Sequence, residues 1–489
     1  MKSAIKLRLF LIIVFFSSLA GCSSSGTSVH SRNITAQFRR DVDSILADSI
    51  FIPTRAAVKI ISLEDGEVLY DRDSKMLMRP GSNLKLLTSA GALSALEKNF
   101  DLRTQLYADT MIVDSVLEGN IYFKGYGDPD FTSDQLEEMI AHLKSKGISH
   151  IAGDIVGDAS YFDDQHWGIG WMWDDEPFGF AAFHSALSIN RNCVEVHVTP
   201  GRIPGDSVFV SVVPPTSYVS VENSGLTGVD TVANTLDVSR KFAERLNVIT
   251  VKGILPRSSS EDVESISVLN PEMYFLTIAK EELTRQNIPF GGTLMLGVVP
   301  RSAFLIAQHD QPLDSMLIFM NKESDNLSAE NMLKILGAEK FGVPGSTQNG
   351  LLVVKHVLST FGIDTTHFLA VDGSGVSHYN LITPEIFVQA LQAMYERKDD
   401  FDSFFKSLPV AGVDGLLKER MKHSAAENNL HAKTGTISGV STLSGYVRTK
   451  DGELLAFSIM MQNFIGSAKP FRVAQDSIGI LMANLSGRK

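Results

Sequence analysis

One stretch of the chain places a serine and a lysine where they can act together on a carbonyl group. It reads RPGSNLK over residues 79–85, so Ser82 precedes Lys85 by three positions. Apolar residues then recur every three to four positions, at Leu86, Leu87, Ala90, Leu93 and Leu96. This spacing predicts a helix with one buried face. Ser82 would lie in its first turn, with Lys85 beside it on the same face.

This pairing predicts a nucleophile and its base. A serine hydroxyl attacks well only when a neighbouring base removes its proton. A lysine can be that base when burial and the positive end of a helix lower its pKa. We therefore predict that Ser82 attacks and that Lys85 activates it. The same S-x-x-K spacing occurs at Ser3 and Lys6, so an ordinary helix start is the alternative, and the interpretation needs partners elsewhere.

A second group is Ser324-Asp325-Asn326, just before a predicted helix over 328–337. From such a loop, the hydroxyl of Ser324 can relay a proton. The amide of Asn326 can orient the lysine and hydrogen-bond a substrate amide. The alternative is a helix N-cap, a role that suits either Ser324 or Asp325.

A third group is Lys433-Thr434-Gly435-Thr436, at the end of a predicted strand, and it contains the only K-T-G of the chain. Lys433 can attract a substrate carboxylate, and the hydroxyls of Thr434 and Thr436 can hydrogen-bond it. Gly435 lets a substrate backbone lie close. The alternative is a surface strand that ends in a turn.

Length and composition limit the class of protein. The chain has 489 residues, of which 44% are hydrophobic and 20% charged, which is typical of a globular protein with two or three domains. The formal net charge is −12, and no stretch is rich in lysine and arginine. Nucleic-acid binding therefore has no electrostatic basis.

The N-terminus reads as a signal peptide over residues 1–21. Basic residues come first, and an apolar run over 9–16 follows, which is too short to span a bilayer. The run leads to LAGC (19–22), which resembles a bacterial lipobox and predicts a lipid on Cys22. Residues 22–34, which include SSSGTS, are predicted to be a flexible spacer. The alternative is an ordinary cleavage site with an incidental cysteine.

The order of predicted elements indicates an α+β fold. Strands over 56–63 and 67–71 precede the Ser82 helix, and strands over 431–436, 441–448 and 453–462 come near the C-terminus. They can join in one antiparallel sheet with helices on its faces. Further helices are predicted over 35–52, 133–146, 312–320, 351–361, 384–397, 415–422 and 470–485. The segment over 151–294 is rich in short predicted strands, over 194–199, 207–213, 231–238 and 248–254.

Taken in chain order, S-x-x-K, S-D-N and K-T-G form the signature of the penicillin-interacting serine enzymes. Ser82 and Ser324 are 242 positions apart, far more than in compact β-lactamases. The chain resembles the class C low-molecular-mass penicillin-binding proteins, the D-alanyl-D-alanine carboxypeptidase/endopeptidase family. Four further stretches fit the family: GYGDP (125–129), GDASYF (157–162), SAL (185–187) and DGSG (372–375).

The resemblance implies a penicillin-binding/serine β-lactamase-like transpeptidase fold with a large two-domain insertion between the first two motifs. The expected catalytic domain comprises residues 35–100 and 295–489. The expected insertion covers 101–294, with a first domain over 101–155 and 265–294 and a nested second domain over 156–264.

The resemblance also implies hydrolysis of the D-Ala-D-Ala ends of peptidoglycan stem peptides through an acyl-enzyme on Ser82, with D-alanyl cross-links as further substrates. The backbone N–H groups of Ser82 and Thr436 would bind the oxyanion. Ser324 would pass a proton to the leaving amine, and β-lactams would be covalent inhibitors. No cofactor or metal is expected, since no H-E-x-x-H pattern occurs.

Two residues of the insertion are candidates for substrate binding. The family places the turn around Asp158 and Tyr161 near the catalytic groove, where an acidic group suits the amino end of a diamino acid. The alternative is a turn with no contact to substrate.

Two other functions share these motifs. A β-lactamase would deacylate fast, and a wall-binding lipoprotein would keep the fold without catalysis.

The lipobox implies a periplasmic protein tethered to a membrane, and Ser23 suggests the outer membrane of a Gram-negative bacterium by analogy with lipoprotein sorting.

Overall fold

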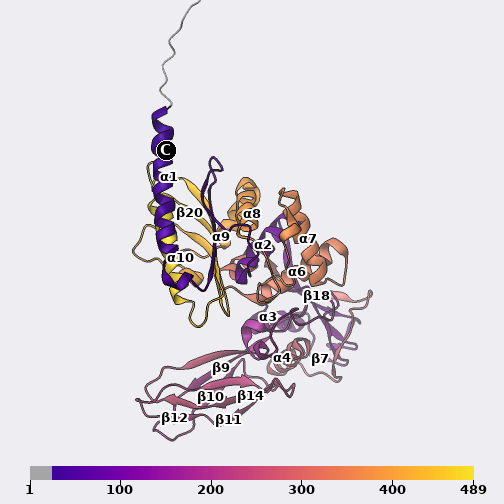
Figure 1. Ribbon diagram of the computed structural model, residues 1–489. Helices are drawn as coiled ribbons and strands as arrows, with labels where there is room; N and C mark the ends of the chain where they lie inside the picture. The colour runs from indigo at the N-terminus through magenta and orange to yellow at the C-terminus, as the bar shows by residue number, and fades with distance from the viewer. Residues whose placement is uncertain (1–24, 489) are drawn as a thin grey trace, which may run out of the picture.

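The two ends of the chain build the central sheet together. The computed structural model describes residues 25–488. Five antiparallel strands lie in the order β19-β20-β21-β1-β2 in the upper body of the molecule (Figure 1). Their bounds are β1 Arg55–Ser62, β2 Val68–Arg72, β19 His431–Ile437, β20 Val440–Arg448 and β21 Leu454–Gln462. The predicted joining of these segments in one sheet is therefore confirmed.

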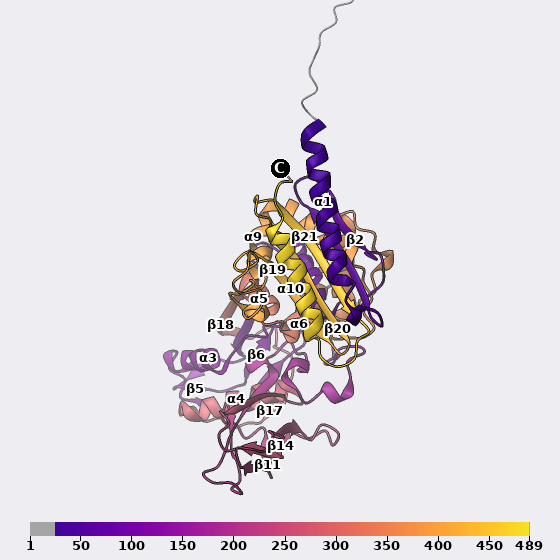
Figure 2. The same ribbon diagram turned by 60° about the vertical axis from the view of Figure 1, so that its left-hand side comes forward.

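Helices cover both faces of this sheet. Helices α1 (Ser25–Leu46) and α10 (Lys469–Asn484) run along one face (Figure 2). The other face carries α2 Leu84–Ala95, α5 Leu313–Lys322, α6 Asn326–Phe341, α7 Thr347–Thr360, α8 Pro384–Glu396 and α9 Lys398–Ser407. All nine residues of β21 are buried, because its alternate side chains enter the two separate cores.

The insertion follows α2 and has its own five-stranded sheet, in the order β17-β8-β6-β3-β18. Its strands are β3 Asp101–Ala108, β6 Ile121–Gly125, β8 Ile155–Asp158, β17 Leu294–Leu296 and β18 Phe304–Pro312. Helices α3 (Ser133–Ser145) and α4 (Pro271–Arg285) pack against it. A small sheet beside it comprises β4 Ile112–Val113, β5 Val116–Leu117 and β7 His150–Ile151.

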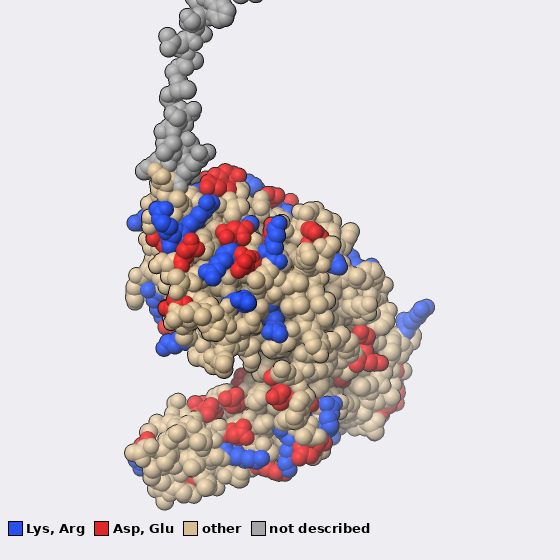
Figure 3. All heavy atoms as spheres, in the orientation of Figure 1, with Lys and Arg blue, Asp and Glu red and all other residues tan. Residues whose placement is uncertain are grey.

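A second part of the insertion is built from short strands only and forms the lower lobe in Figure 3, which a notch separates from the upper body. One sheet contains β9 Cys193–Thr199, β10 Phe209–Val213 and β16 Asp262–Ser267. Another contains β11 Ser220–Asn223, β13 Asp237–Arg240 and β14 Val248–Lys252, and β12 Leu226–Gly228 pairs with β15 Ile254–Pro256. Single 3₁₀ turns are η1 Ser49–Phe51, η2 Gly81–Asn83, η3 Trp173–Asp175, η4 Gly179–Ala181, η5 Asn190–Asn192, η6 Thr365–His367 and η7 Gly415–Leu417.

Some expectations differ from the structure. Strand β18 pairs with β3 along its whole length, so the insertion extends to Pro312 rather than to residue 294. Helix α1 begins at Ser25, so most of the expected spacer over 22–34 is helical. The strand expected over 231–238 begins only at Asp237, where pairing with β14 starts. The helix expected over 415–422 is the single turn η7.

Two helices were not predicted, α4 inside the β-rich segment and α9 after α8. The expected signal peptide and Cys22 lie outside the described residues. Within residues 25–488, no helix is both long and apolar enough to cross a membrane.

Candidate active site

Ser82 lies in the 3₁₀ turn η2, which leads directly into α2. Gly81 before it has a φ of +52°, and a Cβ there would lie 3.2 Å from the backbone of Gly435 and Thr436. Conversely, a Cβ on Gly435 would lie 2.8 Å from the amide nitrogen of Ser82. The two glycines therefore let η2 pack directly against β19. This contact brings the expected oxyanion-hole amides of Ser82 and Thr436 to the same place.

Lys85 is fully buried in the first turn of α2, and its ammonium nitrogen is fully engaged. Nζ donates to Ser82 Oγ at 3.0 Å, to Asn326 Oδ1 at 2.6 Å and to the carbonyl of Ser374 at 2.8 Å. Burial lowers the pKa of Lys85 to about 8, although nearby carboxylates oppose the shift. About a tenth of this lysine is thus neutral at pH 7, and this neutral form can accept the proton of Ser82.

The S-D-N segment serves as a helix cap and also reaches the site. Asp325 accepts from the amide nitrogen of Ser328 at 2.7 Å and so caps α6. Ser324, with a φ of +62°, precedes the cap, and Asn326 is the first residue of the helix. The Asn326 amide donates to the carbonyl of Phe180 at 2.7 Å while its oxygen accepts from Lys85. Asp325 is therefore the helix cap, and Asn326 contacts Lys85 as expected, while the proton relay by Ser324 and the substrate contact of Asn326 stay predictions.

Lys433 is fully buried on the edge strand β19. Its Nζ donates to Ser324 Oγ at 2.9 Å and to the carbonyl of Thr434 at 3.0 Å. Burial, and secondarily the charge of Lys85, lower the pKa of Lys433 well below its ordinary value. All three groups predicted from the sequence thus meet, with Ser82 beside Lys85 and Ser324 beside Lys433.

A cavity of about 450 Å³ opens over these side chains. Ser82, Ser324 and Asn326 line it together with Thr436. The two lysines are fully buried and reach the cavity through the serine hydroxyls that they contact. The insertion contributes further lining residues, Met172, Asp175 and Phe180. The remaining lining residues are Glu323, Val376, His378, Ile437 and Ser438.

The loop behind Lys85 has a role that the sequence did not reveal. This loop is the DGSG stretch (372–375). The carboxylate of Glu330, on α6, accepts from the amides of Gly373 and Ser374 in this loop at 2.9 and 2.8 Å. Asp372 accepts from the amide of Gly375 at 3.0 Å. These two buried carboxylates hold the Ser374 carbonyl against Lys85, and burial together with the charge of Asp372 raises the pKa of Glu330. The DGSG motif was the available signal, but a backbone acceptor leaves no trace in side-chain spacing.

The structure does not bring Asp158 and Tyr161 into this group. Asp158 is fully buried in an ion pair with Lys124 at 2.9 Å and also accepts from the amide of Val299. The hydroxyl of Tyr161 donates to Glu339 at 2.5 Å. Neither residue lines the cavity, and the acid that the insertion places there is Asp175. Its place at the end of the tryptophan-rich stretch WMWDD (171–175) was the signal available in the sequence.

Comparison with known proteins agrees with this geometry. The model of the D-Ala-D-Ala carboxypeptidase 3 (S13) family matches residues 38–485. A D-alanyl-D-alanine carboxypeptidase from an Actinomadura species is 33% identical, over 96% of this chain and 89% of the relative. The D-alanyl-D-alanine carboxypeptidase DacB of Haemophilus influenzae is 30% identical, over 81% of this chain and 83% of the relative.

Solved structures give the same result for the fold. The crystal structure of penicillin-binding protein 4 from Haemophilus influenzae superposes with a TM-score of 0.79 at 28% identity, and the match covers 89% of this chain and 98% of that one. The same protein in complex with a β-lactam superposes with a TM-score of 0.74 at 27% identity, covering 90% and 98%. Three converging motifs, one fold and one family model lead to a single conclusion: this chain belongs to the D-Ala-D-Ala carboxypeptidase 3 (S13) family.

Proposed function

We propose that the protein is a serine peptidase that hydrolyses the D-Ala-D-Ala ends of peptidoglycan stem peptides, and D-alanyl cross-links, through an acyl-enzyme on Ser82. One observation carries this proposal. The nitrogen of a buried lysine with a lowered pKa lies 3.0 Å from the hydroxyl of a serine that lines an open cavity. Nucleophile and base are therefore already in hydrogen-bond contact.

The steps follow from these contacts. Neutral Lys85 takes the proton of Ser82 as the hydroxyl oxygen attacks the carbonyl carbon of the penultimate D-Ala. The resulting oxyanion is bound by the amides of Ser82 and Thr436. Ser324 passes its proton to the leaving D-Ala amine and takes one from the side-chain nitrogen of Lys433, which it contacts at 2.9 Å. Once Lys85 has released its proton to solvent, water attacks the ester with Lys85 as base, and Lys85 then returns this proton to the departing oxygen of Ser82. Thr434, Gly435 and Thr436 form the strand edge along which the substrate's terminal carboxylate binds.

Purified muropeptides provide the direct test of this function. The protein should release free D-Ala from pentapeptides and convert cross-linked dimers into monomers, and chromatography of the products measures both. The rival β-lactamase would turn over penicillin many times per second, whereas the peptidase should keep a stable adduct. A protein that leaves both muropeptides intact would favour the silent wall-binding alternative.

The contacts of Lys433 change the expectation for this residue. Its ammonium group lies against Ser324, which lines the cavity, rather than on the cavity wall itself. A charged hydrogen bond of this kind is worth about 1.5–3 kcal/mol. Lys433→Ala should therefore lower kcat/KM for a D-Ala-D-Ala peptide by about 10- to 150-fold.

A substrate with an amidated C-terminus separates the two roles of Lys433. If the lysine acts through Ser324, the mutation slows hydrolysis of the peptide with a free C-terminal carboxylate and of the amidated peptide by similar factors. If it binds the substrate carboxylate, the amide is already poor for the wild type and the mutation hardly affects it. Lys450→Ala, which removes an exposed lysine, is the matched control.

We also propose that the protein is a periplasmic lipoprotein, held at the outer membrane of a Gram-negative cell by a lipid on Cys22. The lipobox supports this proposal, and so does the direction of α1, whose N-terminal end lies far from the insertion (Figure 2). Cys22→Ser should move the protein from the membrane fraction to the soluble fraction. Cys193→Ser is the control, because Cys193 is a buried free thiol. If the Cys22 variant stays in the membrane fraction, something other than the lipid anchors the protein.

A further inference from the structure

A second cavity, of about 620 Å³, shares no lining residue with the catalytic one. It lies where the loop after β8 meets the first turn of α4 and the end of β17. Its polar lining residues are Ser160, Asp163, Asp164, His166, Ser185, Asn270 and Glu272. Its other lining residues are Gly157, Ala159, Phe162, Ala186, Met273, Leu296, Gly297 and Val298. The cavity lining thus combines acidic and hydroxyl groups with apolar side chains.

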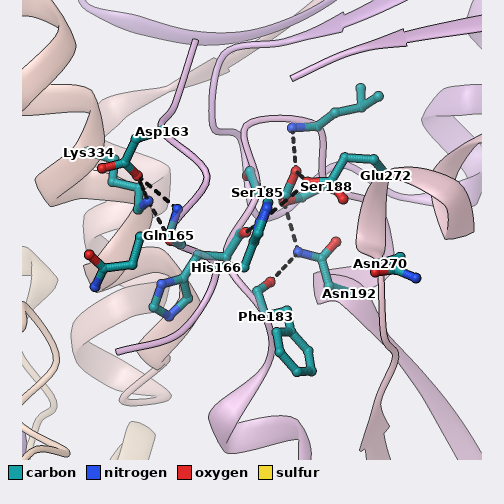
Figure 4. Close-up of polar contacts among 12 residues, drawn as sticks. Asp163, Gln165, His166, Phe183, Ser185, Ser188, Asn192, Asn270, Glu272 and Lys334 are labelled. Carbon is teal, nitrogen blue, oxygen red and sulfur yellow. Dashed lines mark hydrogen bonds and ion pairs between the residues drawn. The ribbon is translucent and has the colours of Figure 1, made fainter. Parts of the chain in front are cut away.

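Glu272 is a buried acid in the lining of this cavity, and Figure 4 shows it beside Ser185. It is only 5% exposed, yet it lines the cavity. Its Oε1 accepts from the hydroxyl of Ser185 at 2.6 Å and lies 3.6 Å from Nδ1 of His166. Among the described residues, no hydrogen bond or ion pair uses its second oxygen. Glu272 therefore keeps half of its acceptor capacity open toward the cavity.

Apart from the imidazole of His166, no basic side chain among the described residues lines the cavity beside this carboxylate. Nδ1 of His166 also contacts the carbonyl of His184 at 2.8 Å. Buried Lys334 forms an ion pair with Asp163 and donates to the carbonyl of Gln165, so its charge is already paired with a carboxylate other than Glu272 (Figure 4). Asp164 is an exposed acid on the cavity lining, and no lysine or arginine lines the cavity. The N-terminal end of α4 favours a negative charge at Glu272, but it explains neither the open oxygen nor the cavity.

The apolar lining residues indicate what kind of cation fits. Leu296 and Val298 are large apolar side chains that are 51% and 64% exposed, and Met273 extends the same surface. A ligand with an ammonium group at the end of an aliphatic chain would pair its charge with Glu272 and Asp164. Its methylene groups would cover the exposed leucine and valine.

We propose that this cavity binds an alkylammonium group, namely the side-chain amine of a diamino acid in a stem peptide other than the one held at Ser82. The assignment of the amine to peptidoglycan rests on the proposed function, whereas binding of the amine itself does not. A peptidase that holds a second stem peptide at a separate site would remain attached to the wall between turnovers.

Calorimetric titration with cadaverine tests the site, using protein acylated at Ser82 by penicillin so that the catalytic cavity is blocked. Cadaverine should bind, and 1-pentanol should bind at least tenfold more weakly. Glu272→Gln should weaken cadaverine binding at least tenfold, and Asp164→Asn several-fold. The glutamine keeps an acceptor for Ser185 and loses only the charge, so the fold is preserved, and an unchanged melting temperature checks this. Glu244→Gln, at an exposed acid in the lower lobe, is the control.

Three results would overturn the proposal: no binding of cadaverine to the wild type, equal binding to Glu272→Gln, or loss of binding on acylation, which would place the amine in the catalytic cavity. A second titration uses a stem tripeptide that ends in lysine. The free amine should bind at least tenfold more tightly than its Nε-acetyl form, and equal binding rules out the stem peptide as the source. Since neither titration requires turnover, unacylated protein gives a readable result even if Ser82 is not the nucleophile.

Discussion

Ser82→Ala will abolish covalent labelling by a fluorescent penicillin and lower peptidase kcat/KM by about 10⁴-fold or more. The mutation removes the atom that forms the acyl bond, and among the described residues no other hydroxyl that lines the cavity contacts Lys85. The melting temperature should stay nearly constant, because the hydroxyl makes one hydrogen bond, at 3.0 Å, to a lysine that keeps two other acceptors. Gel fluorescence and product chromatography measure the two losses.

Ser438→Ala is the matched control, since Ser438 lines the same cavity without touching either lysine in any described contact. It should be labelled at close to the wild-type rate. A covalent adduct on the Ser82 variant would show that another residue is the nucleophile, and peptide mapping of that adduct would identify it.

Lys85 should give the acylation rate a pH dependence with a step near pH 8. The neutral amine is the base, and burial favours the neutral form, which lowers the pKa to about 8. Below that value the neutral fraction falls about tenfold per pH unit, so acylation at pH 6 should be about 100-fold slower than on the plateau at alkaline pH. Lys85→Met should lower the plateau rate by about a hundred- to ten-thousand-fold.

Stopped-flow measurement of penicillin acylation over this pH range tests the assignment. The residual rate of Lys85→Met should lack the step near pH 8. A step that persists in this variant would assign the titration to another group, with Lys433 the first candidate, because its pKa is also lowered. Asp372→Asn offers a further check. It removes a negative charge that raises the pKa of Lys85, so the step should move to lower pH.

The spacing of residues within short motifs predicted most of the catalytic residues. The contacts that it did not predict depend on residues far apart in the sequence. Ser82 and Lys85 are three positions apart in one turn, so their contact follows from helix geometry. The carbonyl of Ser374 has no side-chain signature, although it binds the same lysine. Asp158 looked like a ligand because it is acidic and lies in a family motif. Its ion pair with Lys124 depends on the pairing of β6 with β8, which the sequence does not show.

The expected end of the insertion at residue 294 differs from the structure for a similar reason. Strand β18 pairs with β3, about 200 residues earlier, and only that register shows that it belongs to the insertion. Helix α4 was missed because it stands between short strands, where the surrounding β pattern outweighed its own periodicity. By contrast, the central sheet was predictable, since each of its strands is an apolar run bounded by turn residues.

The way the two chain ends share one sheet also governs when activity arises during synthesis. Strand β1 pairs with β21 about 400 residues later, and Arg488 next to the C-terminus bonds Thr35, Glu67 and Glu453. A growing chain that has completed the whole insertion carries Ser82 but has no β19 to complete the site. Contacts of such long range also fold slowly. Penicillin labelling therefore counts only finished and folded molecules, and a nascent or C-terminally clipped chain remains unable to cut the wall around it.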